Sequence, residues 1–179
     1  MKNKLVAAAL VFSGIILSVI IVGMTRPDQY HVERSIEISA PAEKIYGIAS
    51  DFHRFEEWSP WAERDPNLKK SFEGAPSGVG SIYAWEGNKE VGSGRMIISD
   101  LKANERVDIK LEFLTPWKSE STTSWQLQKL ENGKTKMTWA MEGKNDGLIP
   151  KILSMFLNMD SLIGNDFKQG LAKLKKISE

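Results

Sequence analysis

The sequence predicts an α+β fold, in which a curved antiparallel sheet wraps around one long C-terminal helix. Between residues 30 and 143, several runs alternate apolar and polar side chains with a period of two, as half-buried strands do. The last segment changes to a period of three and four, typical of an amphipathic helix. One apolar sheet face and one apolar helix stripe are buried together when the helix closes over the concave face of the sheet.

The first elements are a strand and two short helices. Residues 30–38 alternate along their whole length, and Pro41 ends this strand. Residues 42–50 then have helical spacing, and residues 51–58 form a second short helical segment with Asp51 as its N-cap.

Six more strands and one helix complete the predicted order. The strands are expected at 68–73, 81–86, 94–101, 106–113, 121–130 and 135–143, with Asn132-Gly133 as a hairpin turn. Within 81–86, Tyr83 and Trp85 lie on the face opposite Ile82 and Ala84. From Pro150 to Ile177 the spacing predicts one continuous helix of roughly seven to eight turns. Its apolar stripe comprises Ile149, Ile152, Leu153, Phe156, Ile163, Phe167, Leu171 and Leu174.

The N-terminus differs from the rest of the chain. Residues 1–4 are short and basic, and the 20 residues 5–24 carry no charge, enough helix to cross about 30 Å of hydrocarbon. A cleaved signal sequence is the alternative, but the apolar run is long and no A-x-A site follows it. We therefore expect a single-pass membrane anchor at 5–24, a linker at 25–29 and a domain at 30–179. The positive-inside rule places the N-terminus in the cytoplasm and the domain outside it, in a periplasmic or extracellular location.

Composition excludes several classes of function. The chain has 24 Lys+Arg against 23 Asp+Glu, so it lacks the basic excess of a nucleic-acid binder. It has no cysteine and two histidines, which argues against thiol chemistry and a protein-held metal. No cofactor is expected.

Three local strings carry a resemblance to a known superfamily. They are Ile38-Ser39-Ala40-Pro41-Ala42-Glu43-Lys44-Ile45-Tyr46, the segment from Phe52 to Trp61 followed by Asp65-Pro66, and the C-terminal stretch from Gly164 to Lys175. Over residues 31–177 the chain resembles the START-like (SRPBCC) superfamily and, within it, the polyketide cyclase/dehydrase-like group. The resemblance implies a helix-grip fold with a cavity between sheet and helix that holds an apolar ligand.

Aromatic and flexible apolar side chains on the predicted inner face are the candidates for lining that cavity. Indole rings offer flat apolar walls and an N–H group, although filling the core is the alternative role for each ring. The full set of candidates is Trp58, Trp61, Tyr83, Trp85, Met96, Ile98, Ile109, Leu111, Trp125, Trp139, Met141, Phe156, Asp160 and Ile163.

Asp160 is the one weak catalytic candidate. Its helical angle places it inside the apolar stripe, where an unpaired carboxylate would be costly. It either pairs with Arg34, Arg95 or an indole N–H, or it contacts a ligand or acts as an acid or base. Neither His31 nor His53 has a visible Asp or Ser partner at a useful spacing, so no catalytic role is expected for them.

The sequence thus predicts a membrane-anchored domain that binds a small hydrophobic or amphipathic ligand, such as a lipid-derived molecule. One alternative is a cyclase/dehydratase- or hydrolase-type enzyme that uses the same cavity. The second is a protein-interaction module whose core is filled and has no cavity. No nucleic-acid partner is expected.

Overall fold

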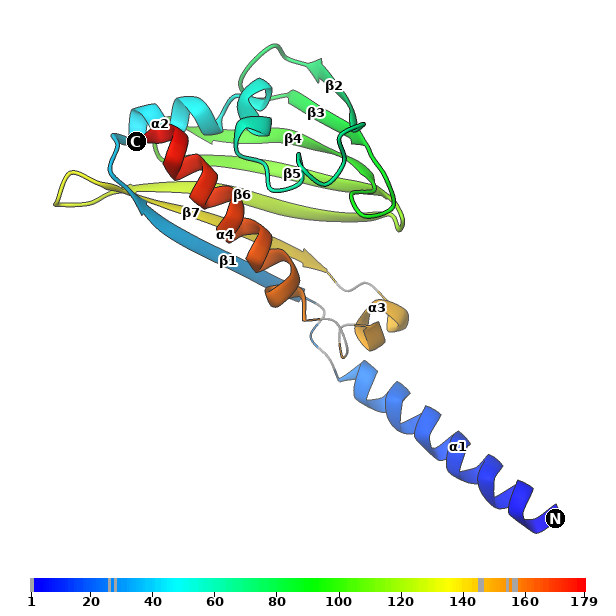
Figure 1. Ribbon diagram of the computed structural model, residues 1–179. Helices are drawn as coiled ribbons and strands as arrows, with labels where there is room; N and C mark the ends of the chain where they lie inside the picture. The colour runs from blue at the N-terminus through cyan, green and yellow to red at the C-terminus, as the bar shows by residue number, and fades with distance from the viewer. Residues whose placement is uncertain (1, 26, 28, 145–146, 154, 156–157) are drawn as a thin grey trace.

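The computed structural model describes residues 2–25, 27, 29–144, 147–153, 155 and 158–179 (Figure 1). After helix α1 (Lys2–Met24) come strand β1 (Gln29–Ile38), helix α2 (Ala42–Ala49) and a 3-10 helix, η1 (Phe52–Glu57). Six strands follow, and the chain ends in two helices. The strands are β2 (Lys69–Gly74), β3 (Ser81–Glu86), β4 (Ser93–Lys102), β5 (Arg106–Thr115), β6 (Ser119–Lys129) and β7 (Thr135–Lys144); the helices are α3 (Leu148–Leu153) and α4 (Met159–Ser178).

The strands form one antiparallel sheet in the order β1-β7-β6-β5-β4-β3-β2. The register pairs Val32 of β1 with Met141 of β7, and Trp125 of β6 with Trp139 of β7. Each pair therefore points to one face, which is the buried one. The predicted sheet is confirmed in its strand number, its direction and the phase of these strands.

Helix α4 lies across the inner face of the sheet, over β1 and β7 (Figure 1). Its side chains Phe167, Leu171 and Leu174 are almost completely buried. Nearer the middle of the sheet, α2 and η1 provide the cover, and Ile45, Phe52 and Phe55 are buried beneath them. A curved antiparallel sheet gripping a C-terminal helix is the predicted helix-grip arrangement.

The single long C-terminal helix was predicted wrongly, because the segment forms two helices. Helix α3 ends at Leu153, and α4 starts after Asn158, whose side chain accepts a hydrogen bond from the backbone N–H of Ser161. An Asn side chain that bonds to the backbone in this way favours a new helix start over helix continuation. Phe156, a member of the predicted apolar stripe, lies outside the described residues.

The N-terminal prediction also needs correction. In the described part of the chain, no helix combines the length and the apolar character needed to cross a bilayer. The predicted membrane anchor at 5–24 is therefore not supported, and the location outside the cytoplasm that was derived from it is wrong.

Candidate ligand site

The space between α4 and the sheet is filled by aromatic rings. Trp139 stacks on Phe167 of α4, with ring centroids 4.3 Å apart and planes 10° apart. Trp58 packs edge-on against Trp125 and Trp139, at 4.8 and 5.3 Å, and Phe55 stacks on Trp125 at 5.7 Å. These contacts are the close packing expected of a filled core in this part of the molecule.

Most of the predicted cavity residues belong to this core. The fully or almost fully buried ones are Trp58, Tyr83, Met96, Ile98, Ile109, Leu111, Trp125, Trp139 and Met141, whereas Trp61, Trp85 and Ile163 are half-buried. Of the described members of the predicted set, none lines either of the two cavities detailed below. Their contact with a ligand stays a prediction.

Two of the buried indole rings carry an N–H group that makes no hydrogen bond to the part of the chain that the structure describes. Within the described residues, the Nε1–H groups of Trp58 and Trp125 are buried without a hydrogen-bond partner. Trp139, by contrast, donates to Thr123 Oγ1 at 2.9 Å, and that hydroxyl donates to the Ala140 carbonyl at 2.8 Å. A buried N–H group without an acceptor is destabilising, so the core carries an energetic cost at these two rings.

Asp160 lies at the surface in the first turn of α4, and 56% of its side chain is exposed. Arg34 of β1 binds both carboxylate oxygens at 2.8 Å and also donates to the Asp160 carbonyl at 2.9 Å. These hydrogen bonds lower the pKa of Asp160 and raise that of Arg34. Of the alternatives considered for Asp160, the structure shows the ion pair with Arg34.

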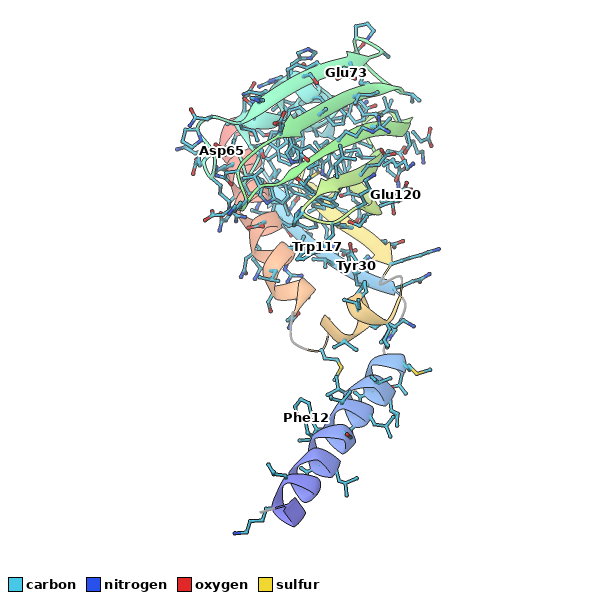
Figure 2. All side chains as sticks on the ribbon, turned by 90° about the vertical axis from the view of Figure 1, so that its right-hand side faces the viewer. Phe12, Tyr30, Asp65, Glu73, Trp117 and Glu120 are labelled. Carbon is cyan, nitrogen blue, oxygen red and sulfur yellow. The ribbon has the colours of Figure 1, made fainter. Side chains whose placement is uncertain are left out.

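A cavity of about 170 Å³ lies elsewhere, between the start of η1 and the end of β2 with the turn that follows it. Glu73, one of its lining residues, marks this end of the sheet, which is the end far from α1 (Figure 2). Apolar rings and polar groups both line it. The lining residues are Ser50, Asp51, Phe52, His53, Phe72, Glu73, Gly74, Ala75, Pro76, Ser77, Ser81 and Ile82.

Asp51 and His53 form a hydrogen-bonded pair at this cavity. Oδ1 of Asp51 accepts the backbone N–H of His53 at 2.9 Å and lies 3.1 Å from Nδ1 of the His53 ring. The His53 ring also stacks on Phe72 of β2, with centroids 4.2 Å apart and planes 18° apart. The imidazole is thus held at one edge and on one face although it is largely exposed.

Behind the cavity wall, Tyr83 joins the core to a surface ion pair. Its ring contacts both Phe52 and Phe72, at centroid distances of 6.2 and 5.7 Å. Burial raises the pKa of Tyr83 to about 12, with smaller contributions from the charge and hydrogen bond of Glu56. Glu56 also pairs with Lys70 of β2, so this ion pair ties η1 to the edge strand.

A second cavity, of about 210 Å³, lies between the start of α2 and the β6–β7 turn. Lys129 and Glu43, which form an ion pair at 2.6 Å, are among its lining residues. It has no aromatic lining residue, so the η1–β2 cavity is the better candidate for an apolar ligand.

The Asp65-Pro66 string has a structural role. The buried carboxylate of Asp65 accepts the backbone N–H of Asn67 at 3.0 Å and that of Asn88 at 2.6 Å. These bonds attach the loop that follows η1 to the β3–β4 turn. Asp65 lies at the side of the domain in Figure 2, well separated from Glu73.

Sequence reasoning missed the Asp51–His53 pair. Asp51 was identified as an N-cap, and His53 was considered to have no acidic partner. An N-cap carboxylate reaches the backbone two residues later, so an Asp-x-His string places a histidine ring within reach of the same carboxylate. The partner Phe72 is 19 positions away, and no local pattern connects it with His53. Across the described residues, no cluster of three metal-binding side chains is present.

Comparison with solved structures supports the fold. Protein CV1439 from Chromobacterium violaceum superposes with a TM-score of 0.59 at 18% identity, covering 86% of this chain and 99% of the other. Protein jhp0584 from Helicobacter pylori gives 0.63 at 13% identity, with coverages of 84% and 88%. The di-domain ARO/CYC protein BexL of the BE-7585A biosynthetic pathway gives 0.60 at 13% identity, covering 89% of this chain and 53% of the other.

No curated protein matches the sequence significantly. A family model described as polyketide cyclase / dehydrase and lipid transport matches residues 29–179, which include the whole sheet, the helices that cover it and the η1–β2 cavity. The chain therefore belongs to the polyketide cyclase/dehydrase and lipid transport family of the SRPBCC superfamily.

Proposed function

We propose that the protein binds a small amphipathic molecule, with its apolar part in the η1–β2 cavity. The observation that carries the proposal is the lining of this cavity, where the Phe52 and Phe72 rings lie beside the polar groups of Asp51, His53 and Glu73. Ligand sites typically combine apolar walls with a few placed polar groups in this way. The family description, with its cyclases and lipid carriers, supports the same class of ligand.

The proposed ligand site lies away from the centre of the molecule. An interior site between sheet and α4 would have to displace Trp58, Trp139 or Phe167, which are packed against one another. The η1–β2 cavity needs no such displacement. At about 170 Å³ it matches one ring, since an apolar cavity of about 150 Å³ binds benzene. A longer ligand would extend from it into solvent.

The test is an NMR titration of the full chain with ring-sized aromatic probes, following backbone amides of residues 50–53 and 72–82. We expect Phe72→Ala to weaken binding strongly, because it removes an apolar wall and the support of His53. Phe113→Ala is the matched control. Phe113 lies on β5, packs against Trp85 at 6.0 Å and does not line the cavity, so this variant loses stability but keeps binding. Equal binding by both variants would contradict the proposed location.

A cyclase-type reaction at the same cavity is the second candidate function. It is favoured by three titratable side chains, Asp51, His53 and Glu73, which all line this cavity. An aldol cyclisation needs a base that removes a proton from carbon and an acid that protonates the carbonyl oxygen. The test incubates a poly-β-ketone thioester with the protein and detects an aromatic product by its ultraviolet absorption. Product that forms with the wild-type chain but not with His53→Phe would establish the reaction. No product with the wild-type chain would count against it.

A further inference from the structure

We infer that His53 selects the polar end of the ligand, by accepting a hydrogen bond at Nε2 from a hydroxyl group on the bound ring. The inference rests on the proposed function and names the ligand class, which is a hydroxylated ring rather than a plain hydrocarbon. The ligand class follows from the hydrogen-bond partner of the imidazole, which is Asp51.

The carboxylate of Asp51 fixes the position of the ring proton of His53. The carboxylate of Asp51 only accepts hydrogen bonds, so the Nδ1 atom 3.1 Å from it must be the donor. In the neutral imidazole one nitrogen donates and the other accepts, and a hydrogen bond at one nitrogen decides the role of the other. Asp51 therefore leaves Nε2 of His53 as an acceptor.

The His53 ring is also held in one orientation. Asp51 holds the Nδ1 edge, and Phe72 covers one face at 4.2 Å. These two contacts leave the Nε2 edge for a ligand. Because Asp51 also caps η1 through the backbone N–H of His53, the carboxylate that orients the ring is itself fixed. A ligand that bonds to Nε2 meets a pre-organised acceptor, so little rotational freedom is lost on binding.

Several other polar groups of the cavity already have hydrogen-bond partners within the protein. Glu73 accepts a hydrogen bond from Ser71 at 2.8 Å, and Ser50 and Ser81 donate to the backbone carbonyls of Tyr46 and Ala75. The donors of these two hydroxyls are thus engaged within the protein. Ser77 also lines the cavity and carries a hydroxyl donor, but the carboxylates of Asp51 and Glu73 and the Nε2 atom of His53 are acceptors. This excess of acceptors matches a hydroxyl donor on the ligand and disfavours a carboxylate.

The experiment uses two probes of nearly equal shape, phenol and toluene, in amide-detected NMR titrations of the full chain. We expect phenol to bind about two- to twelvefold more tightly than toluene, the range that one neutral hydrogen bond provides. In His53→Phe, which keeps an aromatic ring beside Phe72, this preference falls to about one. His31→Phe is the matched control, because His31 lies on β1 between Glu33 and Glu142 and lines neither cavity. It retains the preference.

The outcomes separate the inference from the proposed function. If both probes bind with equal affinity, or if the preference for phenol survives in His53→Phe, the role of His53 is overturned while ligand binding at this cavity stands. If neither probe shifts the amides of residues 50–53 and 72–82, the proposed function is overturned and the inference with it.

Discussion

Gly170, in the middle of α4, provides the sharpest test of how the helix is seated on the sheet. A Cβ atom at this position would lie 2.7 Å from Cζ3 of Trp139, 3.2 Å from Cδ of Pro60 and 3.3 Å from the Trp58 carbonyl oxygen. The first distance is shorter than real side chains tolerate, and the other two are tight. We expect Gly170→Ala to destabilise the protein.

The neighbours of Gly170 have little room to move. The Trp139 ring is held by its hydrogen bond to Thr123 at 2.9 Å and by its stack on Phe167 at 4.3 Å. Inserting a methyl group into such a packed region costs about 1–3 kcal/mol. Replacing a helical glycine by alanine gains about 0.8–1 kcal/mol of helix propensity in return. With rigid neighbours on three sides, we expect a net loss of about 1–2 kcal/mol for Gly170→Ala.

Gly47 is the matched control, because it lies inside α2, is exposed and would have nothing within 4 Å of an added Cβ. Gly47→Ala should gain up to about 1 kcal/mol from propensity alone. The difference between the two variants therefore isolates the cost of packing at Gly170. Urea unfolding followed by tryptophan fluorescence measures both, and the dependence on urea should stay unchanged. A Gly170→Ala variant as stable as Gly47→Ala would show that α4 does not lie against Trp139 as described.

Two further predictions concern the aromatic interior. Trp125→Phe removes an indole N–H that has no acceptor, whereas Trp139→Phe deprives Thr123 of a hydrogen-bond donor. Urea unfolding should therefore show Trp139→Phe to be less stable than Trp125→Phe by about 1–2 kcal/mol. Equal losses of stability would mean that the Trp125 N–H has an acceptor. Burial raises the pKa of Tyr83 to about 12 in the folded state, against about 10 in the unfolded chain. Protonated Tyr83 therefore contributes about 2–3 kcal/mol to the free energy of unfolding below pH 10, and this contribution is lost as the pH rises to 12. Alkaline unfolding of Tyr83→Phe should lack this loss, and an identical pH profile would contradict the burial argument.

The sheet could be predicted from sequence because its physical cause is local. Alternation along a strand such as 106–113 reports which side chains share a face, and Asn132-Gly133 fixes a hairpin, with Gly133 at φ 76°. The helix break could not be found in the same way. The apolar stripe continues in sequence across the break, while the cap at Asn158 depends on one side chain that competes with helix continuation.

Asp160 shows how such a break changes a site prediction. Its position inside the apolar stripe was calculated for one helix running on from Pro150. Because α4 instead begins after Asn158, Asp160 lies in a first turn at the surface, within reach of Arg34 on β1. The pairing with Arg34 was among the alternatives, since a carboxylate near a sheet needs a cation. The exposure was not predicted, because it depends on where the helix starts.

The candidate site arises where the cover of the sheet ends. Helix α4 covers β1 and β7, so the β2–β3 end is covered by η1, a helix of six residues. Phe52 and Phe55 of η1 insert into the core, while Asp51 and His53 stay at the cavity. The short helix η1 and its N-cap therefore both pack into the core and place polar side chains at the cavity. The periodicity of the sequence shows which face of the sheet is apolar, but it does not show how much of that face a helix covers. The cavity lies where this cover ends, so its position could not be predicted from the sequence.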